Sequence, residues 1–287
     1  MLYALVCAQL LLMSGLATQS SQPQSSQPSE IVTVADIAYY GEQAPDDYAR
    51  SRCKLDVKYP KDGHGYTTLV WFHGGGLKEG DRRAGDDLAK RLNQSGIAVV
   101  LVDYRLSPRA KCPAYIEDAA ASVAWVLKNI ASYGGDPQRV FVGGHSAGGY
   151  LTAMVGLDAT YLGRHGLVPK QLAGSLPVSG QMFTHFTIRE ERQIPATTPL
   201  IDALAPAHYA TKETPPTLCM VGDQDLPTRM EENVYCAAAY KAAGNERFRC
   251  QIFAGRDHNT LMTHVLEPDD EVVRAMLAFM DEYAPTK

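Results

Sequence analysis

A serine between glycines forms the most informative motif of the chain. Residues 144–148 read Gly-His-Ser-Ala-Gly, with an apolar run before them and an apolar helical stretch after them. A strand that turns this sharply into a helix needs small neighbours, and it presents the serine hydroxyl at the edge of a sheet. The pattern predicts that Ser146 is a nucleophile. The helix that starts behind it adds positive potential, and we expect the Ala147 amide to contact developing negative charge.

A second glycine motif lies upstream of the first. Residues 73–76 read His-Gly-Gly-Gly and follow an apolar run. Glycines allow backbone N–H groups to face a substrate, so Gly74 and Gly75, together with Ala147, are predicted to bind the oxyanion that forms in acyl transfer. His73 is expected to be structural rather than catalytic.

The acid and the base are expected after the serine, at the ends of later strands. His258, in the loop 255–259, is the predicted base. Asp225 is the predicted acid, because the loop 222–225 has turned away from the sheet at that point. Asp223 is closer to the strand end, where it could brace the turn, and it remains an alternative. Asp257 is a weaker one, since neighbouring side chains generally diverge.

The elements that must position these residues alternate along the chain. Short β-like runs and longer helical patterns follow one another from Leu55 to Gly255, which predicts an α/β fold with a mainly parallel sheet flanked by helices. Several runs are continuously apolar, as in strands buried on both faces. The expected strands are residues 54–59, 67–72, 98–103, 140–143, 176–178, 217–221 and 248–253. The expected helices are residues 84–92, 115–133, 150–157, 230–243 and 271–282.

The chain has 287 residues, of which 45% are hydrophobic, and a formal net charge of −5. This composition is typical of a globular protein and argues against a nucleic-acid-binding surface or a polybasic membrane contact. Small or neutral substrates fit better. Residues 31–287 have no obvious linker, so we expect one catalytic domain.

The N-terminal segment differs in composition from the rest. Residues 2–17 are almost wholly apolar, and a Ser/Gln/Pro tract follows them. We expect residues 1–19 to be a signal peptide and residues 20–30 a disordered spacer, which predicts a secreted or periplasmic protein. The apolar run is shorter than the about 20 residues of a membrane span, so no stable span is expected. No Lys or Arg precedes it, which leaves a misassigned start or an anchor as alternatives.

Six cysteines include Cys7 within the expected signal peptide, and the other five are an odd number. An oxidising compartment would permit one or two disulfides with a thiol left over. None has the spacing of a metal ligand set, so no metal site is predicted. Cys219 and Cys250 lie in apolar runs and are expected to be small buried residues.

Taken together, residues 55–280 resemble the α/β-hydrolase superfamily, in particular the hormone-sensitive-lipase-like esterases and the BD-FAE group of bifunctional feruloyl and acetyl-xylan esterases. Beyond the motifs above, the resemblance includes residues 102–108, 135–137 and 256–259. It implies an α/β-hydrolase fold, a serine esterase with the triad Ser146, Asp225 and His258, an acyl-enzyme and no metal or organic cofactor. Leu77 departs from the pattern, because an aromatic residue usually follows the three glycines; this concerns the shape of the acyl pocket.

Residues 181–216 lie between two expected core strands and are predicted to form a small cover on the substrate side. The cover contains the charged run 189–192. Because a lid for long-chain lipids would be strongly apolar, we expect short acyl groups on a carbohydrate or other small ester. An arylformamidase or amidase-like hydrolase is the alternative among enzymes, since the same triad cleaves amides. A non-catalytic binding module with this fold is the alternative outside enzymes.

Overall fold

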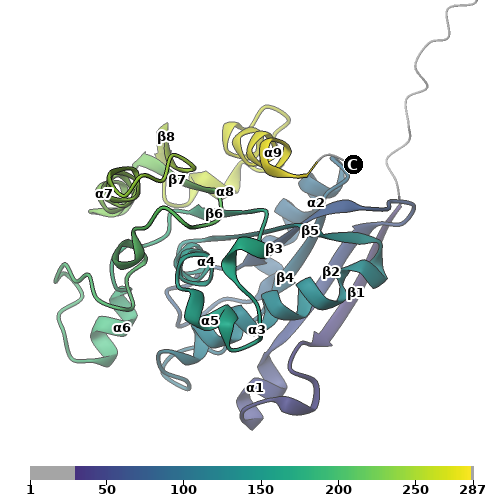
Figure 1. The fold of residues 1–287 in the computed structure, drawn as a ribbon, viewed down its shortest axis with the longest axis horizontal. Coiled ribbons are helices and arrows are strands. Elements are labelled where there is room, and N and C mark those ends of the chain that lie inside the picture. Colours follow the sequence, from purple (N-terminus) through teal and green to yellow (C-terminus); the bar gives the residue numbers. More distant parts are fainter. Residues whose placement is uncertain (1–29, 286–287) are drawn as a thin grey trace, which may run out of the picture.

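Eight strands form one sheet in the order β1-β2-β4-β3-β5-β6-β7-β8 (Figure 1). The structure, a computed structural model, describes residues 30–285. The pairs β1·β2 and β2·β4 are antiparallel, and every pair from β4·β3 to β7·β8 is parallel. The carboxyl ends of six parallel strands therefore meet at one edge of the sheet. The strands are β1 (Ile31–Ala38), β2 (Lys54–Pro60), β3 (Tyr66–Phe72), β4 (Ala98–Val102), β5 (Gly135–His145), β6 (Gly174–Val178), β7 (Thr217–Gln224) and β8 (Phe248–Asp257).

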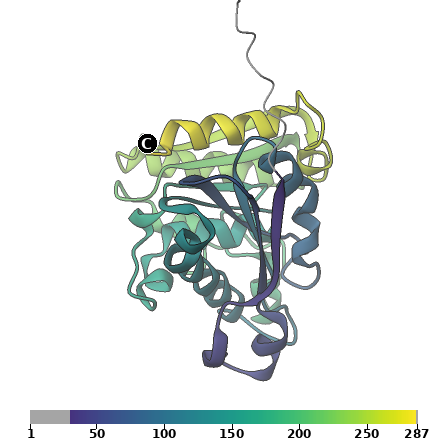
Figure 2. The same cartoon turned by 90° about the vertical axis from the view of Figure 1, so that its right-hand side faces the viewer.

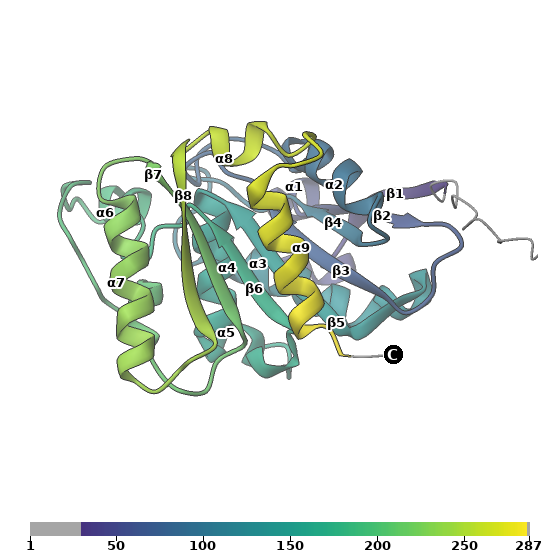
Figure 3. The ribbon, with the colours of Figure 1, turned by 90° about the horizontal axis from the view of Figure 1, so that it is seen from above.

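Helices cover both faces of this sheet because successive side chains of its strands point to opposite faces. Val70 and Phe72 of β3 belong to a hydrophobic cluster with α3 and α4, whereas Leu69 and Trp71 belong to a cluster with α2 and α9. Figure 2 shows α9 lying along one side of the sheet, and Figure 3 shows it crossing over the strands. The helices are α1 (Asp47–Arg52), α2 (Asp86–Asn93), α3 (Ala114–Asn129), α4 (Ala147–Leu157), α5 (Ala159–Gly163), α6 (Phe186–Glu191), α7 (Arg229–Ala242), α8 (Thr260–Thr263) and α9 (Glu271–Tyr283).

The predicted α/β architecture is confirmed, and the expected strands and helices are all present. Several bounds differ, and two of the differences have identifiable reasons. Strand β5 begins at Gly135 instead of residue 140, because Gly135 already pairs with Tyr66 of β3. The predicted helix 115–133 is α-helical only to Asn129 and ends in a 3-10 turn, after which Gly134 adopts a left-handed conformation (φ 92°).

Strand β1 was not predicted. It is one of the two edge strands, and its side chains are exposed or half-exposed along its length although most of its residues are apolar. A bulge interrupts its pairing with β2 between Val34 and Ile37. Within the bulge Asp36 has φ 58°, and its N–H donates to Asp56 Oδ1 at 2.8 Å. A charged bulge of this kind limits pairing of the edge with other chains.

Several further expectations meet the structure only in part. The predicted signal peptide (residues 1–19) and nearly all of the predicted spacer (residues 20–30) lie outside the described residues. Within residues 30–285, no helix has both the length and the apolarity to cross a membrane, and no cluster of three or more His, Cys, Asp or Glu is arranged to hold a metal ion. The five cysteines of that range are free thiols, of which Cys219 is buried and Cys250 partly exposed.

The contact between α4 and β3 leaves no room for a side chain at Gly148. A Cβ atom there would lie 2.0 Å from the carbonyl oxygen of Phe72 and 2.7 Å from that of His73. Backbone cannot move away as a flexible side chain can, so the helix would have to lift from the sheet.

We therefore expect Gly148→Ala to lower the free energy of unfolding by about 3 kcal/mol, the upper part of the usual range for overpacking a core. Chemical denaturation measures this change. Gly163→Ala is the matched control, because Gly163 is exposed and a Cβ there meets nothing within 4 Å; it should leave stability unchanged or raise it slightly. Equal stability of the two variants would contradict the packing argument.

Candidate active site

Ser146 occupies the turn between β5 and α4 in a strained backbone conformation. Its φ is 57° and its ψ is −117°, a combination that is costly for a residue with a Cβ. The surrounding structure holds it there: its N–H donates to the carbonyl of Val178 at 2.8 Å, and its carbonyl accepts from the Tyr150 N–H at 3.0 Å. The flanking Gly144 is needed as well, because a Cβ there would lie 2.5 Å from the backbone of Gly148.

The structure brings together three predicted residues from three different loops. His258 Nε2 lies 2.9 Å from Ser146 Oγ, and His258 Nδ1 lies 2.8 Å from Asp225 Oδ1. Asp225 directly follows β7, and His258 directly follows β8. Both strands end at the same edge as β5, which explains how residues so far apart in the chain meet. The arrangement has the geometry of a nucleophile, a base and an orienting acid.

The other two aspartates make different contacts. Asp223 Oδ1 accepts from the Gly255 N–H at 2.7 Å and so links the last residues of β7 and β8. Asp257 Oδ1 accepts from the N–H groups of Asn259 and Thr260, at 2.9 and 2.8 Å, and so caps the turn that carries His258. The structure places only Asp225 of the three against the imidazole.

Ser179 is a fourth member of this cluster and was not predicted from the sequence. Its Oγ donates to Asp225 Oδ2 at 2.7 Å and lies 2.7 Å from His258 Nδ1. With its hydrogen directed to Asp225, the hydroxyl can only accept from Nδ1. Nδ1 thus faces two acceptors and carries the proton, which leaves the lone pair of Nε2 directed at Ser146.

The environment of Asp225 favours its ionised form. Burial acts in the opposite direction and would raise its pKa, but hydrogen bonds from His258, Ser179 and the Leu226 N–H outweigh burial and lower the pKa below the usual value. The carboxylate therefore stays negative where a positive imidazolium will form next to it during proton transfer.

His145 is a second residue whose position was not predicted from the sequence. Its Nε2 lies 2.8 Å from the carbonyl oxygen of His258, and the two rings are 4.7 Å apart. Burial, followed by the proximity of His258, lowers the pKa of His145 to about 4. Near neutral pH it is therefore an uncharged support that holds the backbone of the His258 loop.

Two of the three predicted oxyanion donors line the same cavity as the serine. Gly74 and Gly75 line that cavity with Ser146 and His258, and a Cβ at Gly74 would lie 3.3 Å from Ser146 Cβ. Ala147 is the first residue of α4, where N–H groups lack partners within the helix. The loop is folded by N–H groups of Lys78 and Glu79, which donate to the Gly75 carbonyl at 2.9 and 3.0 Å.

His73 supports the glycine loop from behind. It is 1% exposed, stacks on Tyr104 at 4.3 Å between ring centroids, and its Nδ1 lies 2.7 Å from the Gly74 carbonyl oxygen. Burial lowers its pKa to about 4, with hydrogen bonding to Gly74 and the charge of Asp103 opposing the shift. This neutral, buried ring matches the structural role expected from the sequence.

The active-site cavity has a volume of about 940 Å³. Leu77 does not line it: the side chain is fully buried in the core, so the departure from the family pattern at this position does not shape the cavity directly. An aromatic wall comes instead from Phe186 of α6, whose Cζ would lie 3.0 Å from a Cβ on Gly76.

The charged run in the cover has a different role from the one expected. Arg189 is 4% exposed and donates to the Thr198 carbonyl, and Glu191 turns inward to accept from Ser107 Oγ at 2.7 Å and the Cys112 N–H at 3.0 Å. Glu191 thus ties the cover to the core, whereas the Arg189 hydrogen bond lies within the cover. These two charges are therefore used in contacts within the protein, and the expectation of short acyl groups stays a prediction.

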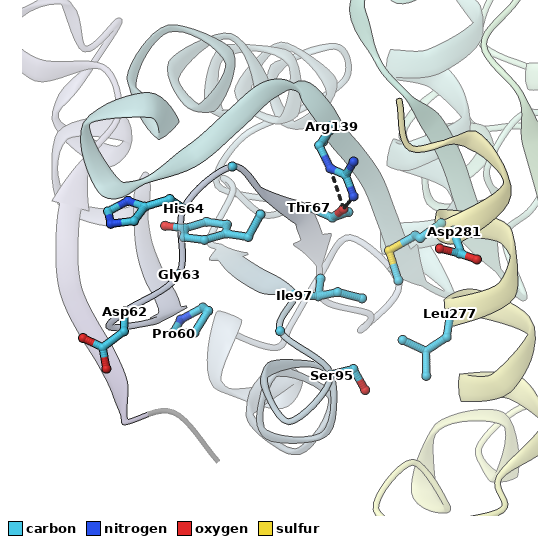
Figure 4. Close-up of a pocket in the computed structure, with 14 residues that line it drawn as sticks. Pro60, Asp62, Gly63, His64, Thr67, Ser95, Ile97, Arg139, Leu277 and Asp281 are labelled. Atoms are coloured by element: carbon cyan, nitrogen blue, oxygen red, sulfur yellow. Dashed lines mark hydrogen bonds between the residues drawn. The ribbon is translucent and has the colours of Figure 1, made fainter. Parts of the chain in front are cut away.

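Another cavity, of about 610 Å³, lies at the opposite end of the sheet (Figure 4). It is lined by residues at the amino ends of β3 and β4 and by α9, and Arg139 beside it donates to Thr67 Oγ1 at 3.1 and 3.2 Å. The residues that line it include none of the Ser146 cluster.

Comparison with known proteins agrees with this architecture. Residues 69–193 match a family model described as alpha/beta hydrolase fold. A probable isoprenylcysteine alpha-carbonyl methylesterase of Oryza sativa is 40% identical over 115 residues, which are 40% of this chain and 25% of that protein. Carboxylesterase NlhH of Mycobacterium tuberculosis is 41% identical over 101 residues, which are 35% of this chain and 32% of that protein. The chain thus spans between a quarter and a third of these relatives.

A solved structure is similar over a much larger part of the chain. The hyperthermophilic esterase from Pyrobaculum calidifontis superposes with a TM-score of 0.69 and 23% identity, covering 89% of this chain and 87% of that one. At this identity the likeness concerns the fold. The α/β-hydrolase fold expected from the sequence is confirmed, while the narrower groups within it remain predictions.

Because Asp225 contacts His258 and Asp223 does not, substitution of these two aspartates should have different effects on kcat. We expect Asp225→Asn to lower kcat for a nitrophenyl ester by about 10⁴-fold, because the amide favours the wrong imidazole tautomer. Asp223→Asn keeps an oxygen for the Gly255 N–H and should cost far less. Steady-state kinetics of both folded variants measures the difference, and a larger loss in Asp223→Asn would contradict the assignment of Asp225.

Ser179→Ala tests the hydroxyl beside the acid. Loss of a hydrogen bond to a charged group predicts a fall in kcat of about tenfold or more. The pKa of Asp225 should rise, so the variant should lose activity at a higher pH than the wild type as the solution is acidified. The control is Ser175→Ala on β6, whose buried Oγ has no hydrogen-bond partner. If both variants gave the wild-type pH profile, Ser179 would have no role in holding the acid.

Proposed function

We propose that this protein, which has the α/β-hydrolase fold, is a serine carboxylic ester hydrolase that works through an acyl-enzyme. The observation that carries the proposal is the hydrogen-bonded series Ser146–His258–Asp225, at 2.9 and 2.8 Å, which faces a cavity that also contains the glycine loop. Ser146 is half-buried and lines this cavity, so its hydroxyl can meet a substrate. The motif resemblance and the carboxylesterase among the relatives support the same reaction.

In the proposed mechanism, His258 Nε2 takes the proton of Ser146 Oγ while Oγ attacks the ester carbonyl. The carbonyl oxygen becomes negative and is bound by backbone N–H groups of Gly74, Gly75 and Ala147. Nε2 then gives the proton to the departing alcohol, and the acyl group remains on Oγ. Water attacks this acyl-enzyme with His258 again as the base, which releases the acid and restores the serine.

We propose short-chain or carbohydrate-linked esters, of acetyl or feruloyl type, as substrates. The cavity lining supports this. Besides the glycine loop it includes the polar side chains Lys78, Glu79 and Asn259, and its large apolar side chains are Phe186 and Leu226. A long acyl chain would require a continuous apolar wall. Small acyl groups attached to a polar alcohol need only a limited apolar contact.

We expect 4-nitrophenyl acetate to have a higher kcat/KM than 4-nitrophenyl decanoate, because the large apolar side chains of the cavity at Ser146 are Phe186 and Leu226. Ser146→Ala should reduce both activities by about 10⁶-fold, the loss typical of removing the nucleophile of such a triad. Initial rates for the two esters measure both effects. A preference for the decanoate would contradict the short-chain proposal while leaving the esterase proposal intact.

The alternatives give different results in the same assays. A binding module would not react with a fluorophosphonate probe, whereas an esterase is labelled at Ser146. An arylformamidase would hydrolyse N-formylkynurenine faster than acetylated xylan or feruloyl esters. This panel therefore separates the reaction class from the substrate class.

A further inference from the structure

Two buried arginines lie beside the active-site cavity without a carboxylate partner. Arg229, the first residue of α7, is 5% exposed and lines this cavity together with Ser146. It also lines a neighbouring cavity of about 390 Å³, which Arg189 lines as well. Neither guanidinium takes part in an ion pair within residues 30–285. The equally buried Arg105, by contrast, is paired with Asp46 and Asp118.

The guanidinium of Arg229 has N–H groups that make no hydrogen bond within the described residues. Its hydrogen bond within the described part of the protein runs from Nη1 to the carbonyl oxygen of Ser179, and its other N–H groups lack a protein acceptor there. Arg189 donates from Nη1 to the Thr198 carbonyl, and its Nε has no partner. Buried donors without acceptors cost free energy unless a ligand or water satisfies them.

The two acidic groups that influence Arg229 already bind other donors. Glu232 Oε2 accepts from the N–H groups of Met182 and Phe183, at 3.1 and 3.2 Å. Asp225 accepts from His258, Ser179 and its neighbour Leu226. Burial lowers the pKa of Arg229, and the charges of Glu232 and Asp225 only partly oppose this. An anion bound at Arg229 would thus supply the acceptor that the guanidinium N–H groups lack.

The lining residues that the two cavities share indicate that the anion belongs to a bound substrate. They share Phe186, Leu226 and Arg229, so a substrate that extends from Ser146 toward α7 passes the guanidinium. The neighbouring cavity is largely walled by apolar side chains, among them Phe183 and Pro199. A bound group therefore contacts apolar carbon on one side and the charged fork of the arginine at the junction.

We propose that the ester hydrolysed at Ser146 carries a carboxylate, and that Arg229 binds this carboxylate. The planar fork of a guanidinium matches the two oxygens of a carboxylate and can donate to both. Arg229 then determines specificity, while Ser146 and His258 perform the chemistry. This inference rests on the proposed esterase function. The carboxylate belongs either to the acyl part or to the alcohol part of the ester, and the experiment has one arm for each.

In the acyl arm, 4-nitrophenyl hemisuccinate is compared with its methyl ester by release of nitrophenol. In the alcohol arm, 4-acetoxybenzoate is compared with its methyl ester by release of acetate. For each pair, the ratio of kcat/KM for the charged ester to kcat/KM for the neutral ester is measured in the wild type and in Arg229→Gln. Comparing the ratio between the proteins cancels the different intrinsic reactivities of the two esters.

We expect Arg229→Gln to lower this ratio by about tenfold or more in one arm, and Arg229→Lys, which keeps the charge without the fork, to lower it less. The matched control is Arg274→Gln, which removes the same charge from the exposed face of α9 and should leave both ratios unchanged. If Arg229→Gln had the wild-type ratio in both arms, the inference would be wrong.

Arg229 also holds the Ser179 carbonyl, so the melting temperature of the variant must be measured. Should Arg229→Gln be unfolded, the wild type still decides: benzoate should inhibit hydrolysis of the neutral ester at least about tenfold more strongly than benzamide, and equal inhibition would overturn the proposal. A folded wild type that hydrolyses none of the esters refutes the esterase function and this inference with it. Hydrolysis of neutral esters without an effect of Arg229 refutes the inference alone.

Discussion

The close approach of α4 to the end of β3 is the constraint on which the rest of the site depends. Because Gly148 has no side chain, the first turn of α4 contacts the backbone of Phe72. That contact fixes where the helix begins, and the residue before it, Ser146, must then take φ 57° to connect β5 to α4. The glycine loop continues directly from Phe72. One backbone contact thus sets both the position of the nucleophile and the start of the loop that is proposed to bind the oxyanion.

The antiparallel edge of the sheet supports this loop through charged groups. Asp103, at the end of β4, accepts from the Arg82 N–H at 2.9 Å and pairs with the guanidiniums of Arg82 and Arg52. Arg52 in turn donates to the Gly80 carbonyl and lies 3.4 Å from His73 Nε2. These groups link β4, α1 and the glycine loop, so the unpredicted N-terminal elements are part of the structure that positions the site. Networks of this kind hold geometry more than they add stability.

Features that depend on a short segment of the sequence were predicted most directly. The nucleophile turn and the glycine loop have local sequence requirements, and strands buried on both faces are visible as apolar runs. The contacts of Asp225 and His258 followed from the chain order of the fold and the edge at which parallel strands end. Ser179 and His145 could not be assigned in this way, because their contacts depend on how β6, β7 and β8 lie side by side. The Ser-Gly pair that directly follows an apolar strand was the available signal for Ser179, since it occurs at the same edge.

The turn after β6 links the acid and the proposed substrate-binding residue. Ser179 has φ 49°, and its N–H donates to the Met220 carbonyl at 2.7 Å, which anchors it to β7. Its hydroxyl contacts Asp225 and His258, while its carbonyl accepts from Arg229. A charge bound by Arg229 would therefore act on a residue that also touches the imidazole. Ser179 thus contributes both to binding of a substrate and to orientation of the base. A change at Arg229 is therefore expected to affect catalysis as well as affinity. The size of the effect on catalysis depends on how firmly the hydrogen bond to β7 holds Ser179 in place.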